Sequence, residues 1–358
     1  MNDHQYVAFG ERKVGDGEPI FVTYEAGPTH EGVESAKDLI RHAARAGADA
    51  VKFQIFDPDR VVEDKSALFT YEILVDRETG KTETVQEPLY DLLKRRALSN
   101  DEWREVKACA DECNLAFFAT IGFPDEVDLV ESLGCASIKI ASGDVNHFPL
   151  IRKAARTGMC LQLDTGNSTI GEIERAIDVI RSEGNDNVII HHCPSGYPAR
   201  LEGINLNIIP SLKTLLGYPV AFSDHSPGWD MDVAAVALGA NLVEKTITKD
   251  RMTRSIEHIF SLEPQDMAAF VQLMRDLPTA LGSSRRIMQP VELEKREIAR
   301  RSTYLAEDTP AGRKLKDCAL DYRRPGGGLA PDQAEALGEQ SLRTDLPAGH
   351  KVMPGDLA

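Results

Sequence analysis

Residues 20–54 read IFVTYEAGPTHEGVESAKDLIRHAARAGADAVKFQ, and this stretch contains a strand, a helix and a second strand in that order. Ile20–Tyr24 and Ala50–Phe53 are short apolar runs rich in β-branched and aromatic residues, which is typical of buried strands. Apolar residues at three- and four-residue spacing predict an amphipathic helix over Ser35–Ala46, and Gly47 ends it. Two strands joined by a helix form a parallel βαβ unit.

The same alternation continues along the chain. The eight predicted strands are Ile20–Tyr24, Ala50–Phe53, Ala116–Ala119, Ser137–Ile140, Cys160–Leu163, Val188–His191, Val220–Phe222 and Leu242–Glu244. Helices are predicted at Ser35–Ala46, Asp101–Cys113, Asp125–Leu133, Pro149–Arg156, Ile170–Ser182 and Met231–Leu238. Eight strands alternating with helices over about 250 residues match a (β/α)8 TIM barrel in count and size. The rival is a doubly wound sheet, but no Gly-x-Gly-x-x-Gly follows the first strand.

Two segments lie outside the minimal barrel. Residues 57–88 form an insert whose sequence FTYEILVDRETGKTETV predicts a β-hairpin, and long barrel loops commonly shape a substrate pocket. After the barrel, expected over residues 1–285, a charged helical linker is predicted at residues 286–301. Short strands, Pro and Gly then predict a small β-rich domain over residues 302–358. The predicted fold class is therefore α/β, a barrel followed by a small β-rich domain.

Composition excludes several classes of protein. Asp and Glu number 57 against 41 Lys and Arg, giving a formal charge of -16. A protein this acidic is a poor nucleic-acid binder, because phosphates are neutralised by clustered Lys and Arg. No stretch approaches the roughly 20 apolar residues of a membrane span. The first residues, MNDHQYVAFGERK, lack an apolar signal core, and the six cysteines are scattered without paired spacing. These features predict a cytoplasmic protein with reduced thiols.

Polar residues gather where the predicted strands end, which is where the chemistry of a (β/α)8 enzyme lies. Lys52 and Lys139, with Ser142 and Ser223 as hydroxyl donors, suit an anionic phosphate or carboxylate. Glu25, at the end of the first strand, is a candidate general acid or base. Further polar strand ends are Gln54, Asp144, Asp164, Thr165, His191, His192, Cys193, Ser195, Tyr197, Asp224, His225, Glu244, Lys245 and Thr246. The residues alone therefore indicate a barrel enzyme that acts on an anionic substrate.

Several motifs together resemble the sialic acid synthase family over residues 20–357. They are EAGPTHEG (25–32), GADAVKFQ (47–54), IKIASGDVNHFPLI (138–151), HCPSGYPA (192–199), FSDHSPG (222–228) and EHIFSLEP (257–264), with RRPGGGLAP (323–331) in the tail. The resemblance implies condensation of phosphoenolpyruvate with an amino-sugar such as N-acetylmannosamine, giving a nine-carbon 2-keto-3-deoxy acid and phosphate. It also implies that the tail is the family's antifreeze-protein-like (SAF) domain.

The resemblance implies roles for individual positions. The residues that match phosphoenolpyruvate ligands are Lys52, Lys139, Ser142, Thr165, Ser195 and Ser223. Those that match positions near the sugar are Gln54, Asp144, Tyr197, Glu257 and Arg324. The remaining matches are Glu25, a carboxylate placed for proton transfer, and His225, a ligand of a divalent metal, Mn2+ or Mg2+. Arg324 matches an arginine that the tail inserts into the partner subunit's site, which implies a domain-swapped homodimer.

The implied reaction joins C3 of phosphoenolpyruvate to the open-chain aldehyde of the sugar, which the metal polarises as a Lewis acid. Water adds at C2, and the intermediate loses phosphate by cleavage of the C–O bond. The lysines stabilise the phosphate charge without forming covalent intermediates.

The sequence departs from the family pattern at the metal and around the sugar. The last strand reads Glu244-Lys245-Thr246, where the family carries a histidine as the second metal ligand. A Thr hydroxyl is a much weaker ligand than imidazole. Either His258 or another group substitutes, or the metal binds weakly, or catalysis proceeds without it. Asp144 and Glu257 also differ in length from the family's carboxylates, so we expect unchanged donor chemistry with a different acceptor.

Two alternatives stay open at this point. One is a phosphoenolpyruvate aldol synthase for a non-sialic aldose acceptor, such as a phosphorylated aldose. The strand ends show no Arg pair to hold an acceptor phosphate, which disfavours that acceptor. The other is a non-catalytic sugar-binding relative, against which the presence of Glu25, Lys52, Lys139 and His225 speaks.

Overall fold

The structure is a computed structural model and describes residues 6–358 of the chain. Eight parallel strands close into a barrel, because β12 pairs with β3 as well as with β11. The barrel strands are β3 (Phe21–Glu25), β4 (Ala50–Gln54), β7 (Ala116–Ile121), β8 (Ser137–Ile140), β9 (Cys160–Asp164), β10 (Val188–His192), β11 (Val220–Asp224) and β12 (Leu242–Thr246). The predicted (β/α)8 barrel is confirmed, and each predicted strand coincides with one of these.

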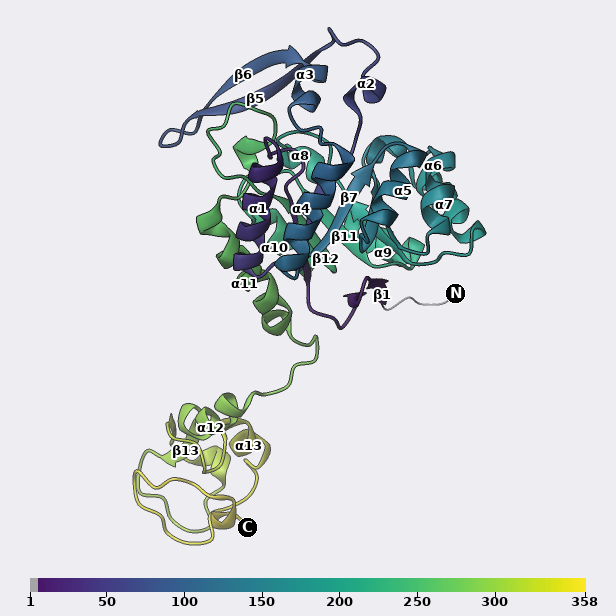
Figure 1. Cartoon of the computed structure of the whole chain (residues 1–358). Helices are drawn as coiled ribbons and strands as arrows, with labels where there is room; N and C mark the ends of the chain where they lie inside the picture. The colour runs from purple at the N-terminus through teal and green to yellow at the C-terminus, as the bar shows by residue number, and fades with distance from the viewer. Residues whose placement is uncertain (1–5) are drawn as a thin grey trace. The chain divides into compact units, whose positions relative to one another are not determined.

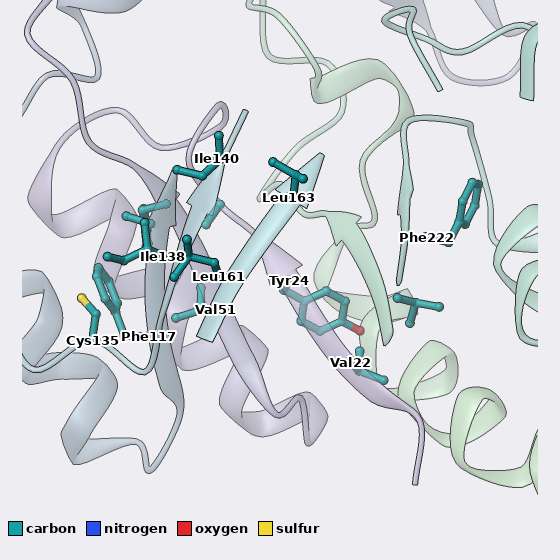
Figure 2. Packing of buried hydrophobic residues seen from close by; sticks show 14 of the residues in the cluster. Val22, Tyr24, Val51, Phe117, Cys135, Ile138, Ile140, Leu161, Leu163 and Phe222 are labelled. Carbon is teal, nitrogen blue, oxygen red and sulfur yellow. The ribbon is translucent and has the colours of Figure 1, made fainter. Parts of the chain in front are cut away.

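Helices surround the sheet (Figure 1). The six at the predicted places are α1 (Val33–Ala46), α4 (Asn100–Glu112), α5 (Pro124–Ser132), α6 (Phe148–Arg156), α7 (Ile170–Ser182) and α10 (Asp230–Ala237). Five further helices were not predicted from the sequence: α9 (Ile208–Leu216), α11 (Pro264–Leu281) and the short α2 (Pro58–Val61), α3 (Leu89–Lys94) and α8 (Leu201–Ile204). Outward-facing strand residues such as Val22, Tyr24, Val51 and Phe117 form the main core with the helices (Figure 2).

The inside of the barrel changes from apolar to polar along the strands. Its first layer is a cluster that comprises Phe21, Ala50, Phe118, Cys160, Ile189, Ala221 and Leu242. Val7, Phe9 and Val14 of the hairpin β1 (Tyr6–Phe9) and β2 (Arg12–Gly15), which was not predicted, join that cluster. Since side chains alternate along a strand, the residues two positions further on also face inward. For those seven strands the residues are all polar: Thr23, Lys52, Thr120, Gln162, His191, Ser223 and Glu244. In β8 the first inward-facing residue is already polar, and Ser137 is followed two positions later by Lys139.

The predicted insert is a hairpin of β5 (Leu68–Asp76) and β6 (Lys81–Pro88), paired antiparallel. Leu74 of this hairpin packs with Ile259 and Phe260, which belong to the 3-10 turn η2 (His258–Phe260). Arg77, in the hairpin turn, donates two hydrogen bonds to the Glu263 carboxylate at 2.7 and 2.6 Å. The hairpin therefore holds the segment that follows β12, including Glu257 at the cavity.

Residues 283–358 form a second compact unit, and residues 1–282 form the first. The second unit contains α12 (Pro290–Ala299), the antiparallel pair β13 (Ser302–Leu305) and β14 (Leu320–Arg323), and α13 (Pro331–Ala336). Its core includes Leu305, Leu315, Leu329, Leu342 and Val352. Regular strand within this unit is limited to those two short strands plus isolated bridges such as Tyr304 with Lys351.

Across residues 6–358, no helix is both long and apolar enough to cross a membrane. All six cysteines are free thiols.

Candidate active site

A cavity of about 330 Å³ opens at the carboxyl ends of the barrel strands. The predicted site residues that line it are Glu25, Lys52, Gln54, Lys139, Ser142, Asp144, Tyr197, Ser223, His225 and Glu257. Asp164, Cys193 and Glu244 also line it, although the sequence analysis assigned no role to them. The barrel therefore brings together residues separated by more than 200 positions in the chain, because parallel strands end at one rim.

Glu244 lies at the centre of the cavity floor. Its Oε1 accepts hydrogen bonds from Lys52 Nζ at 2.7 Å, Lys139 Nζ at 2.7 Å and Ser223 Oγ at 2.9 Å. Burial opposes the charge on Glu244, but Lys139 and Lys52 outweigh it and hold the pKa of this carboxyl well below its usual range. Glu244 is thus ionised and holds both lysines in place. In sequence, its position two residues after the inward-facing Leu242 of the last strand could have indicated that it points into the barrel.

Two further carboxylates share the lysines. Glu25 forms an ion pair with Lys52, and its Oε1 accepts a hydrogen bond from Gly27 N at 2.6 Å. Asp164 Oδ1 lies 3.1 Å from Lys139 Nζ. Burial raises the pKa of Glu25 and of Asp164 against the pull of the lysines. Both carboxyls are therefore poised to exchange protons inside the cavity.

Not every predicted phosphoenolpyruvate ligand faces this cavity. Thr165 Oγ1 donates to the His191 backbone oxygen at 2.8 Å, and Ser195 Oγ donates to Asn167 Oδ1 at 3.1 Å. Neither residue lines the 330 Å³ cavity. Ser195 instead lines a neighbouring groove of about 1050 Å³, which it shares with Tyr197 and the β5–β6 hairpin. Their hydroxyls are engaged by local groups, so the structure does not direct them to the lysines.

Gly166 explains how the loop after β9 approaches Ser142. A Cβ atom at Gly166 would lie 2.7 Å from the Cys193 backbone oxygen and 3.3 Å from Ser142 Cβ. Only glycine allows this close approach, which keeps Ser142 at the cavity wall.

Glu257 occupies the side of the cavity nearest the barrel mouth. Its backbone is left-handed, with φ of 70°, just before the η2 turn. Burial, followed by the charge of Glu25, raises the pKa of Glu257 to about 8. The Arg96 guanidinium opposes this shift. Arg96 is itself buried and donates to the Pro28 backbone oxygen at 2.7 Å, a placement that no sequence pattern indicated.

The residues present do not fit the divalent metal that the resemblance implies. Among residues 6–358, no group of three or more His, Cys, Asp or Glu side chains is placed to hold a metal ion. His225 lines the cavity, while His258 Nδ1 lies 2.7 Å from Thr248 Oγ1, outside the cavity lining. The expectation that His258 substitutes for the missing ligand therefore gains no support. Thr246 is the register partner of Glu25 in the β12–β3 pair. His225 is therefore the single imidazole among the described cavity residues, which is a poor donor set for a transition ion.

The fold and this cavity define an enzyme of the (β/α)8 class whose cavity floor holds two buried lysines among three carboxylates. The sequence model of the NeuB family matches residues 39–286, and the chain belongs to that family. NeuB-family synthases are generally metal-dependent, in contrast to the donor set described above.

Individual relatives resemble most of the chain. It is 32% identical over 350 residues to the N,N'-diacetyllegionaminic acid synthase of Legionella pneumophila, covering 96% of each. It is 31% identical over 339 residues to the human N-acetylneuraminate-9-phosphate synthase, covering 93% of this chain and 91% of that protein. A crystal structure of the N-acetylneuraminic acid synthetase of Leptospira borgpetersenii, in complex with citrate, superposes with a TM-score of 0.71. That comparison gives 29% identity over 81% of this chain and 95% of the other.

Proposed function

We propose that this chain condenses phosphoenolpyruvate with an amino-sugar or related aldose to give a nine-carbon 2-keto-3-deoxy acid and phosphate. The observation that carries the proposal is the convergence of Lys52, Lys139 and Ser223 on one oxygen of Glu244 inside a cavity of a NeuB-family barrel. Three donors fixed at one point are preorganised for a compact anion.

Lys52, Lys139, Ser142 and Ser223 bind phosphoenolpyruvate in this proposal. The floor is not strongly cationic, because Glu25, Asp164 and Glu244 accompany its two lysines. A polyanionic substrate is accommodated when Glu25, whose pKa is raised by burial, takes up a proton, while Asp164 stays ionised beside Lys139. Substrate binding and proton uptake are thus linked, whereas Glu244 stays ionised and keeps the lysines in place.

The acceptor binds toward the mouth, near Gln54, Asp144, Tyr197 and Glu257. C3 of phosphoenolpyruvate attacks the open-chain aldehyde carbon, water adds at C2, and the C–O bond to phosphate breaks. Glu25, beside Lys52 and Gly27, is the group proposed to transfer a proton to the acceptor. A cavity of about 330 Å³ is at the small end for a ligand pocket, so in this proposal the acceptor also contacts the residues at the mouth of the barrel.

A bound Mn2+ or Mg2+ would find His225 as its single imidazole ligand among the cavity residues described, and it would supply Lewis-acid polarisation of the aldehyde. For the tail, we propose the boundaries 286–301 for the linker and 302–358 for an antifreeze-like (SAF) domain. We also propose a domain-swapped homodimer in which Arg324 completes the partner's site. Arg324 lies in the second unit, directly after β14.

Phosphate release from phosphoenolpyruvate tests the proposed function. The acceptor panel comprises N-acylated hexosamines and simple aldoses, each with Mn2+ and with excess chelator. Acceptor-dependent release together with a new keto acid is expected. Binding of phosphoenolpyruvate without release from any acceptor would reject the synthase. Arg324→Ala is expected to depress turnover and leave the dimer intact, and unchanged kinetics would reject the swapped site.

A further inference from the structure

A chain of hydrogen bonds runs beneath the cavity floor, inside the barrel. Ser137 Oγ donates to the Cys160 backbone oxygen at 2.7 Å, and Gln162 Nε2 donates to Ser137 Oγ at 3.0 Å. Gln162 Oε1 lies 2.7 Å from His191 Nε2. The side chains of Ser137, Gln162 and His191 are fully buried, so solvent does not compete for these contacts.

This chain fixes the tautomer of His191. A backbone carbonyl only accepts, so Ser137 must give its one hydroxyl proton to Cys160 and accept from Gln162. The amide of Gln162 therefore turns its oxygen toward His191, and the proton of the neutral imidazole must lie on Nε2. The Nδ1 atom is left as a bare acceptor.

Nδ1 of His191 faces Asp164. His191 Nδ1 has no hydrogen-bond partner among the described residues, and it lies 3.7 Å from Asp164 Oδ1, the oxygen that also pairs with Lys139 Nζ at 3.1 Å. His191 and Asp164 are register partners on adjacent strands β10 and β9. Asp164 lines the cavity, whereas His191 does not. Among the described residues, His191 Nδ1 is therefore positioned to accept a proton that Asp164 takes from the cavity.

We propose that Asp164 and His191 form a proton relay for the water that adds at C2 of phosphoenolpyruvate, an assignment that rests on the proposed function. The water oxygen bonds to C2 and releases one proton to the Asp164 carboxylate, which passes it to His191 Nδ1. The bond between C2 and the bridging oxygen then breaks, its electron pair leaves with phosphate, and His191 returns the proton through Asp164 to the phosphate. Glu25 gives its proton to the former aldehyde oxygen, and the second water proton restores Glu25. Asp164 is the catalytic residue, and His191 is a positioning residue that acts through it.

The charges around His191 favour protonation of its imidazole only when substrate is bound. Burial and then Lys139 and Lys52 lower the pKa of His191 well below its usual range, while Glu244 opposes them. These groups and Asp164 face the imidazole from β8, β4, β12 and β9. The imidazole is therefore neutral in the free enzyme. The negative charge of bound phosphoenolpyruvate offsets the two lysines and makes proton transfer to Nδ1 more favourable.

His191→Gln tests the relay, because the Gln amide nitrogen replaces Nε2 toward Gln162 while Nδ1 is deleted. We expect kcat for acceptor-dependent phosphate release to fall about tenfold or more, with KM for phosphoenolpyruvate and the melting temperature unchanged. His192→Gln is the matched control. The His192 Nε2 lies 2.6 Å from the Ile204 backbone oxygen, and its ring stacks on Phe222, away from the cavity. We expect this variant to retain turnover within about twofold. Equal turnover by His191→Gln and wild type would overturn the relay and leave the proposed function standing.

A second measurement needs no turnover. Nitrogen-15 NMR of histidine-labelled protein, with the His191 signals assigned by their loss in His191→Gln, reports the tautomer directly. A neutral ring protonated on Nε2 in the free enzyme is expected, with a change in the Nδ1 signal when phosphoenolpyruvate is added. A ring protonated on Nδ1 in the free enzyme would overturn the relay. A wild-type protein that releases no phosphate with any acceptor overturns the proposed function, and the relay chemistry with it.

Discussion

Lys139 Nζ contacts Glu244 Oε1 at 2.7 Å across the barrel, although β8 and β12 are not neighbouring strands. Both side chains are almost fully buried. Such a contact is possible only inside a closed barrel, where residues from opposite strands meet. The ion pair therefore both stabilises the barrel and positions a lysine of the proposed phosphoenolpyruvate site. Its disruption is expected to lower stability and to weaken substrate binding.

Replacing Glu244 with Gln should destabilise the barrel. The change removes the charge that Lys52 and Lys139 share in a buried site, and breaking such an arrangement costs about 3 kcal/mol. Urea unfolding measures the free energy of unfolding. Glu34→Gln is the control, because Glu34 is mostly exposed and its pair with Lys37 contributes less than about 0.5 kcal/mol. Equal stability losses in the two variants would contradict this account of Glu244.

Replacing Lys139 with Gln should weaken binding of phosphoenolpyruvate. A charged hydrogen bond to phosphate or carboxylate contributes about 1.5–3 kcal/mol, which corresponds to a rise in Kd of roughly 10- to 100-fold. Calorimetric titration measures the Kd directly. Lys153→Gln serves as the control because Lys153 pairs with Asp128 on the surface. If Lys139→Gln binds phosphoenolpyruvate as tightly as this control, the anion does not lie at the lysines.

Glu257 should impose a pH dependence on stability. Its pKa is raised from the ordinary 4.5 to about 8 in the folded chain. The folded chain thus retains a proton that the unfolded chain releases. The stabilisation is complete below about pH 4.5 and is lost as the pH rises to about 8. Between these limits, Glu257→Gln should gain on the order of 2 kcal/mol relative to wild type, after allowance for solvent at the mouth.

Melting temperatures of wild type and Glu257→Gln, measured in steps from pH 4.5 to 8.5, check this prediction. The gap between the two proteins should change in favour of the variant as the pH rises. Asp164 titrates in both proteins and cancels in the difference, whereas the coupling between Glu257 and Glu25 is part of the difference that is measured. A gap that stays constant over the whole range would show that the Glu257 carboxyl ionises normally.

Thr246→His should strengthen metal binding. His225 is the one imidazole in the described lining of the cavity, and β11 and β12 are adjacent, so a histidine at position 246 would supply a second nearby. Since imidazole is a far better ligand than a hydroxyl for transition ions, we expect Mn2+ to bind about tenfold tighter or more. Titration calorimetry with Mn2+ compares the two proteins. Identical Mn2+ affinities would mean that position 246 does not face the ion.

Much of the barrel was predictable because its strands are buried on both sides. Short apolar runs such as Val220–Phe222 are readily recognised as strands when helices separate them at regular distances. The hairpin β1–β2 was missed because four-residue strands with exposed side chains carry little periodic signal. Pro210 lies within α9 and Pro278 within α11, and proline weakens a helical pattern in sequence.

The candidate site was predictable as residue types at strand ends but not as contacts. Lys52 and Lys139 were recognised from their positions, whereas their common partner Glu244 depends on geometry across the barrel. Thr165 and Ser195 were expected at the phosphate, yet their hydroxyls bond to the His191 oxygen and to Asn167. A hydroxyl satisfies nearby groups readily, so sequence position alone does not determine its direction.

The reaction in water enriched in oxygen-18 tests the central claim most directly. After turnover with phosphoenolpyruvate and an acceptor from the panel, the released phosphate is analysed by mass spectrometry. Our account predicts acceptor-dependent release of phosphate without oxygen-18, because water adds to C2 and the C–O bond breaks. Phosphate that carries one oxygen-18 atom, released whether or not an acceptor is present, would show hydrolysis at phosphorus and contradict the account.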